Sequence, residues 1–207
     1  MFKQKCFLTG LALALALSAC NGQQTSVPID SNTVIPGTEV SRQGEKLALT
    51  GTGIEVGKKM PDTVLVDAAS MKATNLNEYR GSVLFLSIVP SIDTKVCEVQ
   101  THYLGEQGDK LPPTVKRMTI SRDTPFAQTR FAKEAKLEDV QYLSDYKEGT
   151  FGRSTGLLIE DSRLLARSVI LVDKQGIVQY IQVVPDISHL PDMEKAFTKA
   201  AALANQP

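Results

Sequence analysis

An uninterrupted apolar run, SVLFLSIV at residues 82–89, constrains the fold of this chain more than any other segment. Eight residues are too few for a core helix, and the content of Val, Ile and Phe is typical of a strand buried on both faces. Pro90 follows at once and ends the strand, because proline has no N–H to give to a sheet. The segment CEVQTHYLGEQGD at 97–109 can continue as a helix, which Gly105 and Gly108 weaken towards its end. A buried strand that leads into a helix predicts a layered α/β fold.

The same alternation continues along the chain. TVKRMTIS at 114–121 predicts a second strand. RDTPFAQTRFAKEAKL at 122–137 then predicts a helix. Its N-cap is Asp123 or Thr124, and Pro125 is its first residue.

The C-terminal third predicts a strand, a hairpin and a last helix. VQYLS at 140–144 is a short apolar strand. RSVILVDKQGIVQYIQVV at 167–184 contains two apolar stretches around the turn sequence DKQG at 173–176, which is a strong hairpin signal. HLPDMEKAFTKAAALAN at 189–205 closes the chain as an amphipathic helix.

Upstream of the buried strand, KLALTGTGIEVG at 46–57 predicts a β-hairpin around Gly51 and Gly53. MKATNLNEYRG at 71–81 predicts a loop and a short helix. The order of elements predicts a mixed central sheet, parallel where helices cross over and antiparallel at the hairpin. A thioredoxin-like arrangement fits this order.

The first residues are typical of a targeting segment. A basic start, MFKQK, precedes the apolar stretch CFLTGLALALALSA, which is too short to span a bilayer. The stretch ends in LSAC at 17–20, which resembles the lipobox of bacterial lipoproteins and marks Cys20 as the lipidated residue. Asn21 follows, and in a Gram-negative host this favours the outer membrane. We therefore expect an extracytoplasmic protein, lipid-anchored to a bacterial membrane on its periplasmic side.

Three regions follow from this pattern: a lipoprotein signal peptide at 1–19, a flexible tether at 20–44 and one domain at 45–207. The tether prediction rests on a content of Ser, Thr, Gly, Pro and Gln without helical or strand period. Removal of the signal peptide takes away two lysines and no acid, which leaves 21 basic and 23 acidic residues and a net charge of −2. This balance argues against nucleic acid as a partner.

Signal cleavage and lipidation leave Cys97 as the only free thiol of the 207-residue chain. An oxidising compartment favours cysteines paired in disulfides, so a lone thiol there is more easily explained by chemistry than by packing. Cys97 lies in the first turn of the predicted helix, where free N–H groups and the helix dipole favour thiolate, the nucleophilic form. Ionising most of the thiol at pH 7 would raise the thiolate fraction only about 30-fold, because a few per cent of a free thiol is already ionised. The site therefore also needs hydrogen-bond donors for the charge that develops on the group being displaced.

Two neighbours of Cys97 fit such a site. Thr94 precedes it by three residues, so that its hydroxyl can lie on the same side of the helix as the sulfur. Pro90 can shield the sulfur from water. A guanidinium is the remaining expected part, because it stays charged and offers several planar donors.

The spacing Pro-x-x-x-Thr-x-x-Cys in PSIDTKVC resembles the peroxiredoxins. Together with SRDTPFAQTRF and GLLIEDSRLLARSVILVDKQG, it resembles the bacterial thiol peroxidase subfamily over some 160 residues, from about Val40. The resemblance implies a thioredoxin fold, a homodimer, and reduction of hydrogen peroxide and organic hydroperoxides without metal or flavin. It also implies that Cys97 is the peroxidatic cysteine, that Thr94 and Pro90 are its partners, and that Arg167 supplies the guanidinium.

The chain departs from that subfamily at one position. Thiol peroxidases usually carry a resolving cysteine after the PFAQ stretch, and Ala132 stands at that place here. Without a second thiol, no intramolecular disulfide can form. The sulfenic acid on Cys97 would then be resolved by an external thiol or a thioredoxin-like reductant, as in 1-Cys enzymes.

Other interpretations remain open from the sequence. Cys97 could serve a redox sensor or binding module without efficient turnover, or be an apolar filler in a non-catalytic scaffold. His102 lies five residues beyond Cys97 and about 140° around the helix, which disfavours a role as general base. Asp93 fits a loop or capping role, and His189 a structural or exposed one. Two distant histidines and one thiol do not form a zinc site.

Overall fold

A seven-stranded mixed sheet forms the centre of the molecule, in a computed structural model that describes residues 26–206. The strand order is β11-β10-β6-β7-β8-β4-β5. The pairs β6/β7 and β7/β8 are parallel and the other pairs antiparallel, as the sequence predicted for a mixed sheet. The strands are β4 (Val64–Asp67), β5 (Ala73–Asn75), β6 (Val83–Ile88), β7 (Val115–Ser121), β8 (Gln141–Ser144), β10 (Ser168–Val172) and β11 (Val178–Val183).

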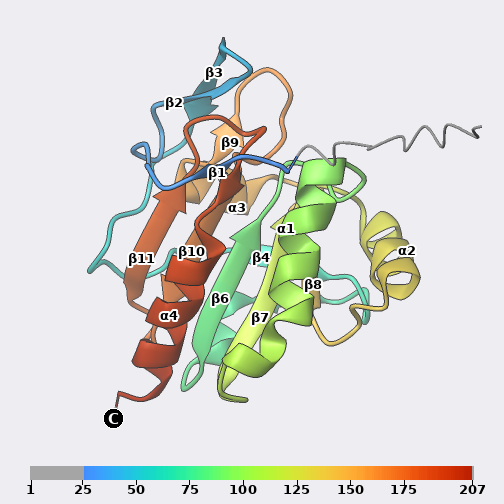
Figure 1. The fold of residues 1–207 in the computed structure, drawn as a ribbon, viewed down its shortest axis with the longest axis vertical. Coiled ribbons are helices and arrows are strands. Elements are labelled where there is room, and N and C mark those ends of the chain that lie inside the picture. Colours follow the sequence, from blue (N-terminus) through green and yellow to red (C-terminus); the bar gives the residue numbers. More distant parts are fainter. Residues whose placement is uncertain (1–25, 207) are drawn as a thin grey trace, which may run out of the picture.

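Helices α1 (Lys95–Glu106) and α4 (Met193–Ala204) cover one face of this sheet, and α2 (Pro125–Ala135) packs beside them against β8 (Figure 1). All six residues of β6 are buried, which confirms a strand enclosed on both faces. The chain runs from β6 through α1 to β7 and through α2 to β8, so two crossover helices join the parallel strands.

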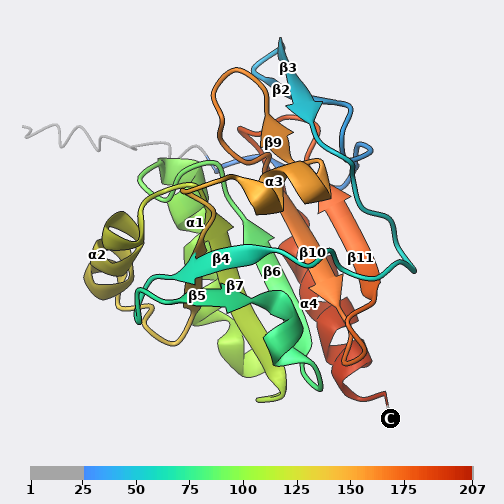
Figure 2. The ribbon, with the colours of Figure 1, turned by 180° about the vertical axis from the view of Figure 1, so that it is seen from behind.

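A smaller sheet and α3 (Thr150–Thr155) lie at one end of the opposite face, the upper end in Figure 2. The smaller sheet has the order β2-β3-β9, formed by β2 (Glu39–Arg42), β3 (Glu45–Thr50) and β9 (Leu158–Ile159). Alternate residues of β6 belong to two cores: Phe85 lies in the core beneath the helices, whereas Leu84 and Leu86 lie in the core on the opposite face of the sheet. Two short 3₁₀ turns, η1 (Leu76–Tyr79) and η2 (Gly108–Lys110), complete the elements of the domain body.

The predicted tether at 20–44 is wrong for most of its described part. β1 (Ile29–Asp30) pairs with β12 (Leu190–Pro191), and β2 lies antiparallel to β3 with Val40 buried. We call residues 28–43 the N-terminal strap. The strap has no readable period, because its strands are short and two of its pairing partners lie more than a hundred residues away.

An N-terminal hairpin is present, but not at the predicted residues 46–57: β3 pairs with the upstream strand β2, and residues 51–57 form no strand. β2 and β3 are joined at Gln43 and Gly44, not at Gly51 and Gly53. Gly51 has a φ of +123°, and a Cβ there would lie 1.9 Å from the carbonyl oxygen of Arg153. This glycine is therefore required for a close backbone approach rather than for a hairpin turn.

The predicted hairpin at 173–176 and the helices at 122–137 and 189–205 are confirmed by β10/β11, α2 and α4. No helix within residues 26–206 has the length and apolar content needed to cross a bilayer. The predicted signal peptide and Cys20 lie outside the described residues.

Candidate active site

Cys97 is the third residue of α1, and its side chain is fully buried. Thr94 is the N-cap residue of this helix, but its hydroxyl caps no backbone N–H. Instead, Thr94 Oγ1 lies 2.9 Å from Cys97 Sγ. The free N–H groups of the first turn and the helix dipole place positive potential around the sulfur.

Arg167 reaches the sulfur from the other side and is itself only 2 % exposed. Its Nη2 lies 3.4 Å from Cys97 Sγ, its Nη1 donates to Gln100 Oε1 at 2.8 Å, and its Nε donates to the Ile187 carbonyl at 2.8 Å. No carboxylate among residues 26–206 forms an ion pair with this guanidinium. The other two partners of this buried guanidinium, Gln100 and the Ile187 carbonyl, are neutral acceptors.

The register of the sheet brings these distant residues together. β10 runs antiparallel to β6, and Ser168 pairs with Ile88 at the end of β6. Arg167 directly precedes Ser168, so it lies beside the point where the chain leaves β6 for α1. A sequence separation of 70 residues is thereby reduced to contact distance.

The loop between β6 and α1 is held from a neighbouring strand end. Pro90 is buried at the start of this loop. The Asp123 carboxylate, just beyond β7, accepts hydrogen bonds from Ser91 Oγ at 2.8 Å and from the Ile92 N–H at 2.7 Å. The sequence had suggested Asp123 or Thr124 as N-cap of α2; Thr124 takes that role, and Asp123 binds the loop.

Gln100 is the site residue that sequence reasoning missed most clearly. It is fully buried, accepts from Arg167, and donates through Nε2 to Ser87 Oγ at 2.8 Å. Its position three residues after Cys97, on the same helix face, was an available signal. Ile187 could not have been found in the same way, because it contributes only its backbone carbonyl.

The remaining candidates lie away from the sulfur. His102 is flanked by Glu106 at 2.8 Å and Glu98 at 3.9 Å on α1, which fits no role at the thiol. Asp93 forms an exposed ion pair with Arg130 at 3.1 Å. Residues 26–206 contain no group of His, Cys, Asp and Glu side chains suited to a metal ion.

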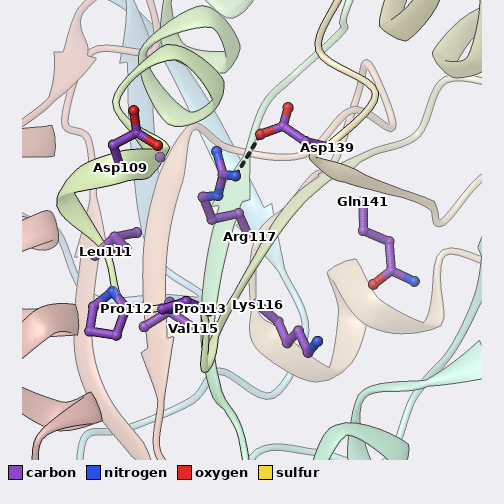
Figure 3. A pocket seen from close by; sticks show the side chains of 10 residues that line it. Asp109, Leu111, Pro112, Pro113, Val115, Lys116, Arg117, Asp139 and Gln141 are labelled. Carbon is purple, nitrogen blue, oxygen red and sulfur yellow. Dashed lines mark hydrogen bonds and ion pairs between the residues drawn. The ribbon is translucent and has the colours of Figure 1, made fainter.

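A cavity of about 640 Å³ lies at the opposite end of the sheet from Cys97. It surrounds the starts of β7 and β8, and Figure 3 shows Arg117 directed at Asp139. Arg117 binds Asp139 at 2.6 Å and also donates to the Leu104 and Gly105 carbonyls near the end of α1. These bonds tie α1 to the sheet, and neither of the side chains that donate to the Cys97 sulfur lines the cavity.

Comparison with known proteins identifies the family. The Redoxin family model matches residues 55–197. The thiol peroxidase of Bacillus subtilis (strain 168) is 39% identical over 166 residues, which cover 80% of this chain and 98% of that protein. The thiol peroxidase of Listeria innocua serovar 6a is 38% identical over 163 residues, 79% of this chain and 98% of its own length.

Solved structures agree with this assignment. A peroxiredoxin-like protein from Aquifex aeolicus superposes with a TM-score of 0.76 at 29% identity, covering 82% of this chain and 99% of that one. A thiol peroxidase from Chromobacterium violaceum shares the fold with a TM-score of 0.70, at 21% identity and coverages of 80% and 98%. With its buried thiol at the start of α1, the chain belongs to the redoxin family and, within it, to the thiol peroxidases of the peroxiredoxin type.

Proposed function

We propose that this thiol peroxidase reduces hydrogen peroxide and organic hydroperoxides through Cys97 alone, in a 1-Cys cycle. The observation that carries the proposal is the pair of donors on the sulfur, Thr94 Oγ1 at 2.9 Å and Arg167 Nη2 at 3.4 Å. Donors in this position can bind peroxide oxygens and stabilise the charge that develops when the O–O bond breaks.

The first half of the cycle consumes peroxide. The Cys97 thiolate attacks one peroxide oxygen in line with the O–O bond, and that bond breaks. Sulfur is oxidised to sulfenic acid, while the departing oxygen takes up a proton and leaves as water or an alcohol. Thr94 and Arg167 donate hydrogen bonds to the two oxygens, and Pro90 limits the access of water.

The second half of the cycle requires a thiol from outside the chain. Cys97 is the only cysteine among residues 26–206, and Ala132 in α2 carries no thiol. An external thiol condenses with the sulfenic acid to a mixed disulfide and water, and a second thiol then releases the Cys97 thiol by exchange. A low-molecular-weight thiol or a thioredoxin-like protein would serve as reductant.

The proposal extends to cellular context. Lipidation of Cys20 would anchor the enzyme on the extracytoplasmic side of a bacterial membrane, the outer membrane in a Gram-negative host. The sequence pattern of residues 1–20 supports this anchor. We also propose a homodimer, which equilibrium sedimentation of the purified domain would test.

Thiol counting combined with mass spectrometry tests the cycle. Purified mature protein receives one equivalent of peroxide, with and without glutathione, beside a Cys97→Ser control. We expect loss of one thiol per chain, a mass increase of one oxygen, and conversion to a mixed disulfide when glutathione is present. An unchanged thiol with unconsumed peroxide would contradict the peroxidase proposal.

The absence of a resolving cysteine favours one alternative, a redox sensor in which oxidised Cys97 is a signal. Steady-state assays with glutathione and with thioredoxin separate the two functions. Many turnovers per chain would exclude a pure sensor, whereas a single turnover with a long-lived sulfenic acid would support it.

A further inference from the structure

The buried sulfur poses a problem for the second half of the cycle. Cys97 is fully buried, so a thiol of any size can attack the sulfur only after the surrounding chain has moved. Hydrogen peroxide needs much less room than a thiol carried by glutathione or a protein. The contacts that hold the loop between β6 and α1 therefore affect the two half-reactions differently.

Two hydrogen bonds of this loop are accepted by one carboxylate, that of Asp123. Asp123 Oδ1 accepts from Ser91 Oγ at 2.8 Å, and Asp123 Oδ2 accepts from the Ile92 N–H at 2.7 Å. Both oxygens of one side chain are thus used on two successive residues of the loop. Hydrogen bonds to a charged carboxylate are stronger than those between neutral groups.

The same loop positions the Thr94 hydroxyl. The Ser91 carbonyl accepts from the Thr94 N–H at 3.2 Å and also lies 3.1 Å from Thr94 Oγ1, whose single proton can be donated either to this carbonyl or to the sulfur. Thr94 Oγ1 in turn lies 2.9 Å from Cys97 Sγ. A displacement of Ser91 would therefore move the hydroxyl that faces the sulfur.

Asp123 itself is fixed by buried groups at the ends of β7 and β8. Its N–H donates to Ser121 Oγ at 3.3 Å, and its carbonyl accepts from the Ser144 hydroxyl. Gln128 Nε2 donates to Ser121 Oγ at 2.9 Å and to the Leu143 carbonyl at 3.0 Å. Ser121, Ser144 and Gln128 are all buried, so buried hydrogen bonds hold the backbone that carries the Asp123 carboxylate.

We propose that Asp123 is a positioning residue that latches the loop over Cys97. The closed latch holds Thr94 for the reaction with peroxide, and its opening admits the external thiol to the sulfenic acid. This inference rests on the 1-Cys cycle proposed above, since only an external thiol needs the loop to open.

Separate measurement of the two half-reactions tests the latch. Stopped-flow oxidation of the thiol by peroxide gives the first rate, and reduction of preformed sulfenic acid by glutathione gives the second. For Asp123→Ala, which removes both hydrogen bonds to the loop, we expect about a tenfold slower oxidation, because Thr94 is no longer held at the sulfur, and a several-fold faster reduction by glutathione. For Asp123→Asn we expect both rates to return towards those of the wild type, because an amide can still pair with Ile92 and Ser91.

A matched control comes from the same loop. Asp93 carries the same charge but binds only exposed Arg130, so Asp93→Ala should leave both rates within about twofold. If Asp123→Ala does not fold, Ser91→Ala removes one of the two bonds and should shift both rates in the same directions by a smaller factor. Equal slowing of both half-reactions, or no change in either, would overturn the latch.

Failure of the latch can be told apart from failure of the proposed peroxidase function. If wild-type protein forms no sulfenic acid, the peroxidase cycle fails, and the latch is judged by hydrogen exchange at the Ile92 amide. Faster exchange in Asp123→Ala than in Asp93→Ala would support the latch as a structural device. Equal exchange in the two variants would reject it.

Discussion

At the scale of single residues, the site depends on a guanidinium whose three nitrogens each face a different group. Nε binds the Ile187 carbonyl, Nη1 binds Gln100 and Nη2 faces the Cys97 sulfur. The rigid fork of arginine satisfies these three directions at once, and burial makes each bond costly to lose. Two substitutions test the fork.

Arg167→Lys keeps the positive charge but cannot reach three acceptors in fixed directions. We expect the second-order rate constant for peroxide to fall about 100-fold, the loss typical when one preorganised donor is removed from a developing charge. Stopped-flow kinetics measure it. Arg130→Lys, at an exposed ion pair, is the matched control and should be neutral. A loss below threefold in Arg167→Lys would remove the guanidinium from the mechanism.

Gln100→Met keeps the length of the side chain and removes the acceptor for Arg167. The unpaired guanidinium N–H should cost about 1–3 kcal/mol of unfolding free energy, and the misplaced Nη2 should slow oxidation of Cys97 about tenfold. Urea denaturation and stopped-flow kinetics measure the two effects. Gln175→Met, at an exposed turn position, should change neither. A normal oxidation rate in Gln100→Met would show that Arg167 needs no support from this residue.

At the scale of elements, the N-terminal strap supports the same arginine from behind. The Ile187 N–H donates to the Ser41 carbonyl at 2.8 Å, and the Ile187 carbonyl accepts from Arg167. The neighbouring Asp186 accepts from the Gln43 N–H at 2.9 Å. One residue thus separates β2 of the strap from the guanidinium, so that loosening of the strap should disturb the site.

Acid should loosen this strap. Partial burial raises the pKa of Asp186, but hydrogen bonds from Ser188 and Gln43 and the charge of His189 outweigh it and hold the pKa below the ordinary value of 3.8. Ionised Asp186 therefore stabilises the strap fully above the ordinary aspartate pKa of 3.8, and this stabilisation is lost as the pH falls through the lowered pKa. Hydrogen exchange of residues 28–43, corrected for intrinsic rates, should show less protection in acid below about pH 4 than at about pH 5.

The variant Asp186→Ala isolates this contribution. It should exchange faster at residues 28–43 already at neutral pH and oxidise more slowly with peroxide. Asp161→Ala, which changes an exposed loop carboxylate, should behave as the wild type. Equal protection of the strap in both variants would show that Asp186 does not hold it.

At the scale of the whole molecule, the strap shortens the segment that would connect the domain to a membrane anchor at Cys20. Eight residues, 21–28, separate Cys20 from β1. A fully extended spacer of that length reaches at most about 28 Å. An anchored enzyme would therefore stay close to the bilayer instead of extending away from it on a long tether.

Cys20→Ser tests the anchor in the producing cell. We expect the protein to move from the membrane fraction to the soluble extracytoplasmic fraction, because the thiol that accepts the lipid is absent. The peroxide rate of Cys97 should stay unchanged, since the substitution alters neither Thr94 nor Arg167, the two side chains that face the sulfur. Fractionation with immunoblotting measures the first result. Retention of Cys20→Ser in the membrane would argue against lipidation.

The sequence by itself determined the local parts of this protein. The buried strand β6, its end before Pro90, the start of α1 and the spacing of Thr94 and Cys97 all lie within a few residues of one another, where propensity and helix geometry decide. Of the site residues, Cys97 and Thr94 could be derived in this way, whereas Arg167 came from family resemblance.

Only the tertiary structure decided which distant groups complete the site. The pairing of β10 with β6 brings Arg167 to the sulfur, the parallel order of β6 and β7 brings Asp123 to the loop, and the strap is held by partners near the C-terminus. Such contacts depend on sheet register and on backbone groups that every residue carries, so no local pattern records them.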